Sequence, residues 1–256
     1  MIKSKLDLRQ FKHLQLFNTL NDDTLLKLSA VMRVVKYPKK TTVFRDKQPL
    51  DDVYISLGGK FSLYKLNDKS TKRIIFLFDQ GILLNDHLKL DFPSAIDCET
   101  FEDSAVLVCS KKDFLKIMAE DYQLAEAVID QYASKLRRTY RQLKNAPTNI
   151  SIEKKLAGKL YALCRHYGVW KKDGILIDFP LTVTHLAEML GAPRETVSRA
   201  FGKLVKEGLI EYEKKRILVY NVNAIVCFYR EKSTSRLCDK CSKEGQHDCF
   251  FQHVEG

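Results

Sequence analysis

Short apolar runs alternate with turn residues from Arg33 to about Ser110. The clearest apolar runs lie at 53–57, 61–64 and 74–78. Glycine, asparagine, aspartate and serine mark the separators, at 58–59, 67–70 and 79–81. Strands this short, at this spacing, are typical of a small antiparallel barrel or jelly roll.

Helical patterns flank this β-region. The first covers 22–32, with Asp22 or Asp23 expected as its cap. Its apolar face consists of Leu25, Leu28 and Met32. The second pattern runs from Lys111 to Lys144 without a glycine or a proline, so we expect one long helix there.

The long helix carries an apolar stripe whose successive members are 4, 3, 4, 4 and 3 residues apart. The stripe consists of Ala125, Ile129, Tyr132, Leu136, Tyr140 and Leu143. This spacing is close to a coiled-coil seam. A helix of about 30 residues is about 45 Å long, which exceeds one small domain. We therefore expect the stripe to pack on a second copy of the chain; the alternative is that it packs back on its own barrel.

A second folded region follows a break at 145–149. Ser151 is positioned to cap a helix that runs to about Tyr167, and 175–179 is expected to form a strand. Residues 180–206 then read as two short helices separated by a tight turn at Gly191, which is the helix-turn-helix pattern. Its inner face is expected to consist of Leu186, Met189, Leu190, Val197, Leu204 and Val205.

Four polar residues lie between the core positions of the second short helix: Arg194, Glu195, Ser198 and Arg199. Arginine can bond bidentately to guanine and glutamate can accept from cytosine, so these side chains suit base edges in a major groove. Two strands at 208–212 and 216–220 complete the wing of a winged helix. The pattern predicts DNA binding; the alternative is a helical hairpin with a solvated polar face.

Length and charge support this division. At 256 residues the chain is long enough for two domains. The formal net charge is +11, and the excess is densest in 151–230, which suits a polyanion such as nucleic acid. We expect an α+β chain with a β-roll (jelly-roll) domain at 1–110, a dimerisation helix at 111–145, a winged helix-turn-helix domain at 146–225 and a cysteine-containing tail at 226–256.

Two other classes are disfavoured. No apolar run is long enough to span a bilayer and the first 20 residues contain no continuous apolar block, so we expect a cytosolic protein without a membrane partner. The chain also lacks the phosphate-binding glycine loops and the His-Glu-x-x-His motif of common enzymes, and we expect no catalytic activity.

The sequence resembles the family of bacterial regulators named after the cyclic-AMP receptor protein and the fumarate/nitrate reduction regulator (CRP/FNR). The likeness covers roughly residues 15–222 and is most specific at 193–199 (Pro-Arg-Glu-Thr-Val-Ser-Arg), followed by Gly-Leu-Ile at 208–210. It implies that the β-roll at 1–110 is a sensor domain. It also implies a homodimer that binds an inverted repeat in double-stranded DNA and works with RNA polymerase. By the same resemblance, the readers of base and backbone are Arg194, Glu195, Ser198 and Arg199.

The resemblance also bears on the effector. Family members that bind cyclic nucleotides hold the phosphate with a Gly-Glu pair and an Arg-Ser pair. Here Asn85-Asp86 stands in place of the first pair and Pro93 in place of the arginine. A buried phosphate needs charge-assisted donors, so we do not expect a cyclic nucleotide to bind. Another small organic effector in the barrel stays open.

The tail contains Cys238, Cys241 and Cys249 within 12 residues. Oxygen-sensing members of the family hold a [4Fe–4S] cluster with three cysteines and a fourth ligand. A Gram-positive branch of FNR-like regulators carries these cysteines at the C-terminus, and this tail resembles that arrangement. The resemblance implies a redox-responsive cluster on these three thiolates. Candidates for the fourth ligand are Cys227 and Asp130.

Other uses of the tail stay open. Together with His247 or His253, the three cysteines would make a Cys3His zinc site. A dithiol switch between Cys238 and Cys241 is another alternative, and so is a tail without a function. The remaining cysteines, at 98, 109, 164 and 227, are scattered in apolar surroundings and are expected to be small buried side chains.

Overall fold

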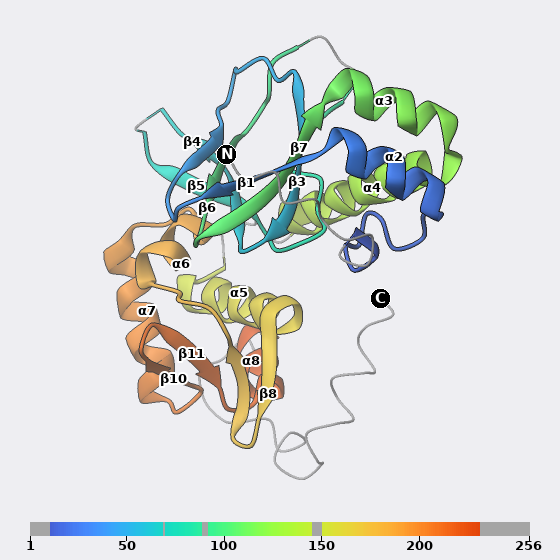
Figure 1. Ribbon diagram of the computed structural model, residues 1–256. Coiled ribbons are helices and arrows are strands. Elements are labelled where there is room, and N and C mark those ends of the chain that lie inside the picture. The colour runs from blue at the N-terminus through green and yellow to red at the C-terminus, as the bar shows by residue number, and fades with distance from the viewer. Residues whose placement is uncertain (1–10, 69, 89–91, 145–149, 231–256) are drawn as a thin grey trace. The chain divides into compact units, whose positions relative to one another are not determined.

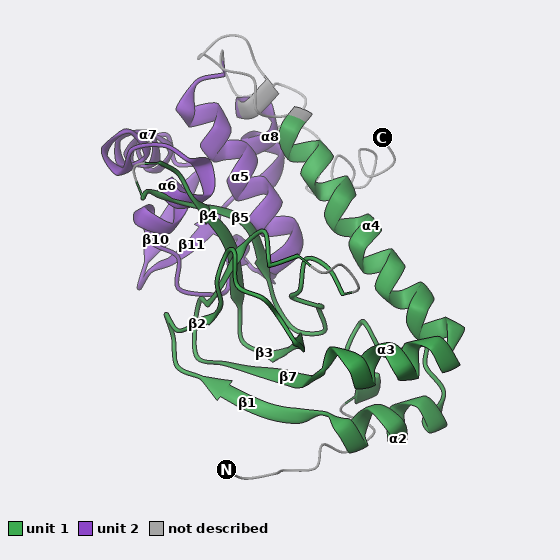
Figure 2. Cartoon of the chain, turned by 90° about the horizontal axis from the view of Figure 1, so that it is seen from above, with its two compact units in different colours: residues 1–146 green, residues 147–256 purple. Residues whose placement is uncertain are grey.

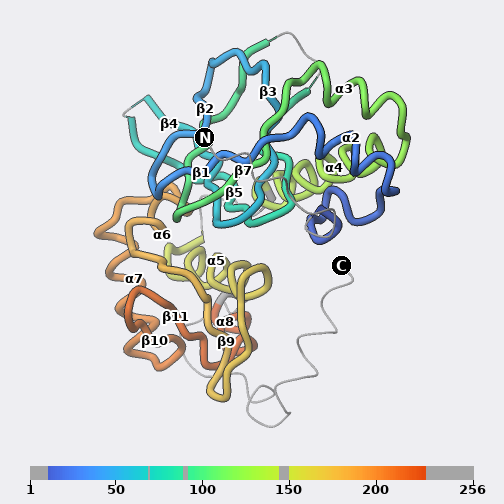
Figure 3. Tube along the Cα trace, viewed as in Figure 1, coloured from blue at the N-terminus to red at the C-terminus, as the bar shows by residue number. Residues whose placement is uncertain are grey.

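The computed structural model describes residues 11–68, 70–88, 92–144 and 150–230. The chain divides into two compact units, Met1–Ala146 and Pro147–Gly256, coloured green and purple in Figure 2. The order of helices and strands is labelled in Figure 1, and the path of the backbone through them is drawn in Figure 3.

The first unit contains two antiparallel sheets. One has the order β1 (Arg33–Tyr37), β7 (Ser104–Ser110), β3 (Asp52–Gly58). The other has the order β2 (Thr42–Phe44), β6 (Asp97–Thr100), β4 (Phe61–Leu66), β5 (Lys72–Phe78). The strands coincide with the apolar runs of the sequence, so the expectation of a β-roll is confirmed.

The core of this unit consists of two apolar clusters, and successive side chains of β7 point alternately into one and the other. Val106 and Val108 point into an apolar cluster shared with strands of the second sheet. Leu107 and Cys109 point the other way, into a cluster completed by the helices α2 (Asp22–Val31), α3 (Lys111–Glu120) and α4 (Tyr122–Lys144). Successive side chains of a strand face opposite sides, so one strand serves both clusters.

The cap of α2 differs from the expectation. The side chain of Asn21, rather than Asp22 or Asp23, accepts a hydrogen bond from the Thr24 amide at 2.9 Å. Asn21 has extended backbone angles, as an N-cap residue requires, whereas both aspartates already lie in the helix.

The expectation of one helix over 111–144 was wrong. The helix breaks at Asp121, whose backbone is extended, into α3 and α4. The Asp121 carboxylate accepts hydrogen bonds from the hydroxyl of Thr24 and from the amide of Gln123. A polar side chain that bonds the following amides is the usual way to begin a helix, so no glycine or proline is needed here.

The second unit combines helices with a four-stranded antiparallel sheet. Its helices are α5 (Ile152–Tyr167), α6 (Val183–Leu190), α7 (Arg194–Lys206) and α8 (Val222–Arg230). The sheet has the order β10 (Ile210–Glu213), β11 (Arg216–Val219), β9 (Gly174–Ile177), β8 (Gly168–Lys171). The helix α5 begins at the expected cap, Ser151, and packs against α7 and α8.

Two elements of this unit were missed in the sequence. One is β8, which pairs with β9. The other is α8, and the boundary expected at 226 falls inside it. The side chain of Asn221 accepts from the amides of Asn223 and Ala224, at 2.9 and 3.1 Å, and so begins the helix. Ile225 is fully buried.

Candidate nucleic-acid interface

The segment from α6 to α7 forms the expected helix-turn-helix. Thr182 caps α6 and accepts a hydrogen bond from the amide of His185 at 3.2 Å. Gly191 ends α6 with φ of 63°, in the left-handed region that favours glycine. The turn is therefore specified by local residues at both ends.

Apolar residues fix which face of α7 is turned inward. They are Val197, Ala200, Phe201 and Leu204, all buried. The expectation that Val205 lies inward was wrong, because this side chain is 41% exposed. It follows Leu204 by one residue, about 100° further round the helix, and so lies outside the buried face.

The four residues expected to read DNA lie on the opposite face. Arg194, Glu195, Ser198 and Arg199 are all exposed. Their positions in α7 place them on one side of its first two turns. No hydrogen bond or ion pair links their side chains to another part of the chain that the structure describes. The donors of both guanidinium groups are therefore available to a partner.

The start of α7 adds to this surface. Its N-cap is Pro193, and no side chain bonds the amides of the first turn. Free amides at a helix N-terminus, with the helix dipole behind them, favour an anion such as a phosphate. The side chain of His185 is not available in the same way, since its Nδ1 accepts a hydrogen bond from the Thr182 amide in the capping box.

The wing lies between β10 and β11. Its turn residues Lys214 and Lys215 have φ of 49° and 63°. Both lysines are exposed, and Lys214 forms an ion pair with Glu213 at 3.3 Å. A two-residue turn of this kind usually holds Asn-Gly, because residues other than glycine, asparagine and aspartate are strained at positive φ. Two lysines here place positive charge at the tip despite that strain.

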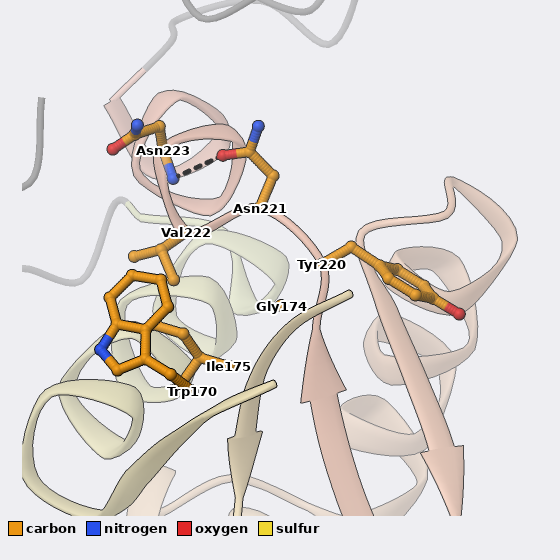
Figure 4. Close-up of a pocket in the computed structure, with 7 residues that line it drawn as sticks. All are labelled: Trp170, Gly174, Ile175, Tyr220, Asn221, Val222 and Asn223. Atoms are coloured by element: carbon orange, nitrogen blue, oxygen red, sulfur yellow. Dashed lines mark hydrogen bonds between the residues drawn. The ribbon is translucent and has the colours of Figure 1, made fainter. Parts of the chain in front are cut away.

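A small pocket in the same unit does not resemble a catalytic site. Figure 4 shows its lining, from Trp170 on β8 to Asn223 on α8. The ring of Tyr220 points away from Trp170, and its hydroxyl donates to the carboxylate of Glu211. No histidine, cysteine or carboxylate is among the lining residues.

The β-roll was expected to lack the residues that hold a cyclic nucleotide. Asn85, the first residue of the Asn85-Asp86 pair that replaces Gly-Glu, is fully buried. Its side chain accepts from the amide of Tyr54 at 2.8 Å and donates to the carbonyl of Asp52 at 3.0 Å. Both ends of the amide are thus used within the chain.

Sequence reasoning missed a cation that α4 brings to this region. The Nζ of Lys135 donates to the carbonyls of Leu83 and Asn85, at 2.5 and 3.0 Å. One turn earlier, Gln131 donates to the carbonyl of Gly81 and accepts from the amide of Leu83, both at 2.8 Å. Burial lowers the pKa of Lys135 to about 8, against a smaller opposite effect of the Asp86 carboxylate. The sequence signal for this contact is the pair of polar residues, Gln131 and Lys135, on the inward face of the amphipathic helix α4.

The tail cysteines, at 238, 241 and 249, lie outside the described residues. Of the two candidates for a fourth ligand, Cys227 lies half-buried on α8 and Asp130 lies exposed on α4. Within the described ranges, no group of three metal-ligating side chains is brought together. Burial raises the pKa of Cys109 and of Cys164 to about 12, which keeps both thiols protonated at neutral pH.

Comparison with protein families gives two matches. The Crp-like helix-turn-helix domain family matches residues 154–226, and the cyclic nucleotide-binding domain family matches residues 34–121. No helix among the described residues is long and apolar enough to cross a bilayer.

Curated relatives align with most of this chain. The chain is 22% identical to a CRP-like cAMP-activated global transcriptional regulator of Mycobacterium tuberculosis, over 80% of this chain and 91% of the relative. It is 24% identical to the anaerobic regulatory protein of Bacillus subtilis, over 78% of this chain and 85% of the relative. Among solved structures, FixK2 from Bradyrhizobium japonicum has the same fold, with a TM-score of 0.67 at 19% identity, over 79% of this chain and all of that one.

Proposed function

Because the chain belongs to the CRP/FNR family of transcription regulators, we propose that it binds an inverted-repeat site in double-stranded DNA as a homodimer. Regulators of this family bind DNA as dimers. The observation that carries the proposal is the exposed polar face of α7, with Arg194, Glu195, Ser198 and Arg199, whose side chains bond no other residue that the structure describes. These residues would reach base edges and phosphates in the major groove.

The second half of the proposal concerns α4. Four members of its apolar stripe are between 51% and 67% exposed: Ile129, Leu136, Tyr140 and Leu143. A regular apolar stripe left exposed on one chain suits the same stripe on a second chain, because both lose their contact with water together. This pairing would place two α7 helices against half-sites about one helical turn apart.

A DNA-binding titration tests this function. Fluorescence anisotropy should show tight binding to a duplex selected from a random pool, and the selected sequence should be an inverted repeat. Affinity should fall steeply with salt, because each phosphate contact releases counterions. Selection of no symmetric sequence, or binding that salt leaves unchanged, would contradict the proposal and favour a different class of protein.

We also propose that the tail makes the regulator responsive to oxygen or redox state. Support comes from the spacing of Cys238, Cys241 and Cys249 and from likeness to a protein named anaerobic regulatory protein. Three thiolates and a fourth ligand would hold a [4Fe–4S] cluster, which supplies oxygen-sensitive redox chemistry when bound. A change in the tail would alter how the paired α4 helices pack and thereby switch DNA affinity. The bound dimer would then act on RNA polymerase.

Anaerobic purification tests the redox proposal. Brown protein that contains iron and sulfide and bleaches in air would support it. Changing Cys238, Cys241 or Cys249 to serine should then abolish the air response of DNA binding while the fold persists. Colourless protein with one zinc per chain would instead make the tail structural and would favour a small organic effector in the β-roll.

A further inference from the structure

The wing is joined to the helix-turn-helix through one residue, Leu181. This residue directly precedes Thr182, the N-cap of α6, and its side chain is fully buried. The amide of Leu181 donates to the carbonyl of Lys215 at 2.7 Å. Its carbonyl accepts from the hydroxyl of Tyr212 at 3.1 Å. Both backbone groups of a residue at the start of α6 are therefore bonded to the wing.

The bond to Lys215 acts on a strained turn. Glu213 of β10 lies opposite Arg216 of β11, so Lys214 and Lys215 form the two-residue loop between the strands. Both loop residues have positive φ, which is unfavourable for lysine. A strained backbone of this kind persists where the surrounding structure holds it. The amide of Leu181 supplies such support from outside the hairpin.

The ring of Tyr212 makes a contact of a different kind. Its centroid lies 5.2 Å from that of Phe201, with the two rings edge to face at 81°. This is one of the favoured arrangements of two aromatic side chains. Phe201 belongs to the buried face of α7. Tyr212 thus joins three elements: its backbone lies in β10, its ring contacts α7 and its hydroxyl bonds the start of α6.

The place of Tyr212 in β10 gives this side chain its leverage on the wing. The strand β10 lies at the edge of its sheet. Side chains alternate along a strand, so Ile210, which is buried, and Tyr212 share the inward face, and the other two residues are exposed glutamates. Tyr212 is the last inward-facing residue before the tip. An ion pair between Arg216 and Asp178, at 3.0 Å, joins the neighbouring strand to the segment before α6, but both side chains are largely exposed and such pairs contribute little.

We propose that Tyr212 is a positioning residue for DNA binding, which holds the wing against α6 and α7 so that the wing lysines and the polar face of α7 meet DNA as one surface. This inference rests on the proposed function. A wing that is already held in position has little ordering cost when DNA binds. Once the wing is released, Lys215 would lose its phosphate contact although its charge is still present.

The substitution Tyr212→Phe tests the proposal in the full chain. It removes the hydroxyl, keeps the ring beside Phe201 and changes no charge. Affinity for the selected duplex should fall several-fold, and the slope of affinity against salt should decrease by about one phosphate contact, as for Lys215→Ala. Fluorescence anisotropy over a range of salt concentrations measures both. A residue that only stabilised the fold would not change the salt slope.

The matched control is Tyr220→Phe. Tyr220 and Tyr212 are both 37% exposed, and the hydroxyl of Tyr220 also donates a hydrogen bond, at 2.5 Å to Glu211 of the same sheet. That bond does not reach α6, so the control should keep the salt slope of the wild type. The double variant Tyr212→Phe with Lys215→Ala should bind about as tightly as Lys215→Ala alone, because the lysine contributes little once the wing is released.

A second measurement needs no DNA. Hydrogen exchange of the Leu181 amide reports how often its bond to the Lys215 carbonyl opens. Exchange should become at least about three-fold faster in Tyr212→Phe, since the neighbouring bond that holds the wing is lost. It should stay unchanged in Tyr220→Phe.

Three results would overturn the proposal. A wild-type salt slope in Tyr212→Phe, or losses of affinity that multiply in the double variant, would mean that Tyr212 does not position the wing lysines. Unchanged exchange of the Leu181 amide would mean that the hydroxyl does not hold the wing tip. A wild type that binds no DNA would instead contradict the proposed function itself, and the exchange rates would still decide whether Tyr212 holds the wing.

Discussion

The helices α4 and α7 bury one face in the same way and differ in the other. On α4 the buried face includes Leu124 and Val128, and on α7 it includes Val197 and Leu204. The outward face of α4 is apolar along the stripe that contains Ile129, Leu136, Tyr140 and Leu143. The outward face of α7 begins with Arg194, Glu195, Ser198 and Arg199.

This difference separates two kinds of partner. An apolar stripe is stabilised by another apolar surface, and heptad-like spacing restricts that surface to a second helix of matching period. A row of charged and hydroxyl groups without partners instead suits a surface of phosphates and base edges. The buried faces specify the fold, and the outward faces specify what the fold binds.

The largest effect is expected when a charge is placed in the apolar stripe of α4. Leu136→Glu should weaken the dimer at least about 100-fold, close to 3 kcal/mol, because two carboxylates would be buried in an apolar seam. Affinity for an inverted repeat should fall with it. Sedimentation equilibrium measures the first effect and anisotropy the second.

Ser134→Glu is the matched control, since position 134 is exposed on α4 about 160° around the helix from Leu136. It adds the same charge away from the stripe and should leave the dimer intact. Equal dissociation of both variants would mean that charge, rather than the apolar stripe, controls association. A Leu136→Glu dimer as tight as the wild type would remove α4 from the interface.

The next test concerns the outward face of α7. Arg199→Ala should cost about 1–3 kcal/mol on the selected site and relax base choice at one position of each half-site. Lys206→Ala, at the far end of the same helix, serves as the control and should weaken all sequences alike. Anisotropy with selected and random duplexes distinguishes the two, and equal losses on both duplexes for Arg199→Ala would exclude a role in base reading.

Periodicity made the outward faces of both helices predictable, because residues three and four apart share a side whatever lies elsewhere in the chain. The break at Asp121 was not predictable in this way. The carboxylate that caps α4 also accepts from the hydroxyl of Thr24, which is 97 residues distant in the sequence, and this contact exists only in the folded unit. The start of α8 differs, since its signal is local: the side chain of Asn221 accepts from the amides of Asn223 and Ala224.

The polar face of α7 and the surroundings of Lys135 also differ in how far the sequence predicts them. The face of α7 is a local property of 13 consecutive residues, and the sequence contains all of its signal. The contacts of Lys135 and Gln131 join α4 to residues 81–85 after β5, and these two segments meet only in the folded unit. The sequence shows that Pro93 stands where nucleotide-binding relatives have an arginine. It does not show that Lys135 lies near this loop, because the helix that supplies Lys135 is about 50 residues further along the chain.

A third prediction uses this lysine, which sets the buried face of α4 apart from that of α7. The pKa of Lys135 is lowered from 10.5 to about 8 by burial, so between these values the unfolded chain binds a proton that the folded chain has lost. The free energy of unfolding should therefore rise with pH in this range, by about 2 kcal/mol from pH 7.5 to 9.5 relative to Lys135→Met. Urea denaturation of both proteins measures it, and identical pH profiles would contradict a desolvated ammonium at this position.

The smallest expected effect is at the wing, where one substitution should raise the stability of the fold and lower the affinity for DNA. Lys215 has φ of 63°, so Lys215→Gly should relieve strain and raise the free energy of unfolding by about 0.5–1 kcal/mol. The same change should weaken DNA binding and reduce the slope of affinity against salt by about one phosphate contact.

Lys215→Ala separates these two consequences of the wing turn. Alanine loses the charge as glycine does, but its Cβ keeps the strain of positive φ, so DNA affinity should fall equally while stability does not rise. A glycine variant that gains stability and keeps full DNA affinity would mean that the wing lysine contacts no phosphate. The outward chemistry of the second unit would then be confined to α7, which would make its contrast with the apolar face of α4 sharper still.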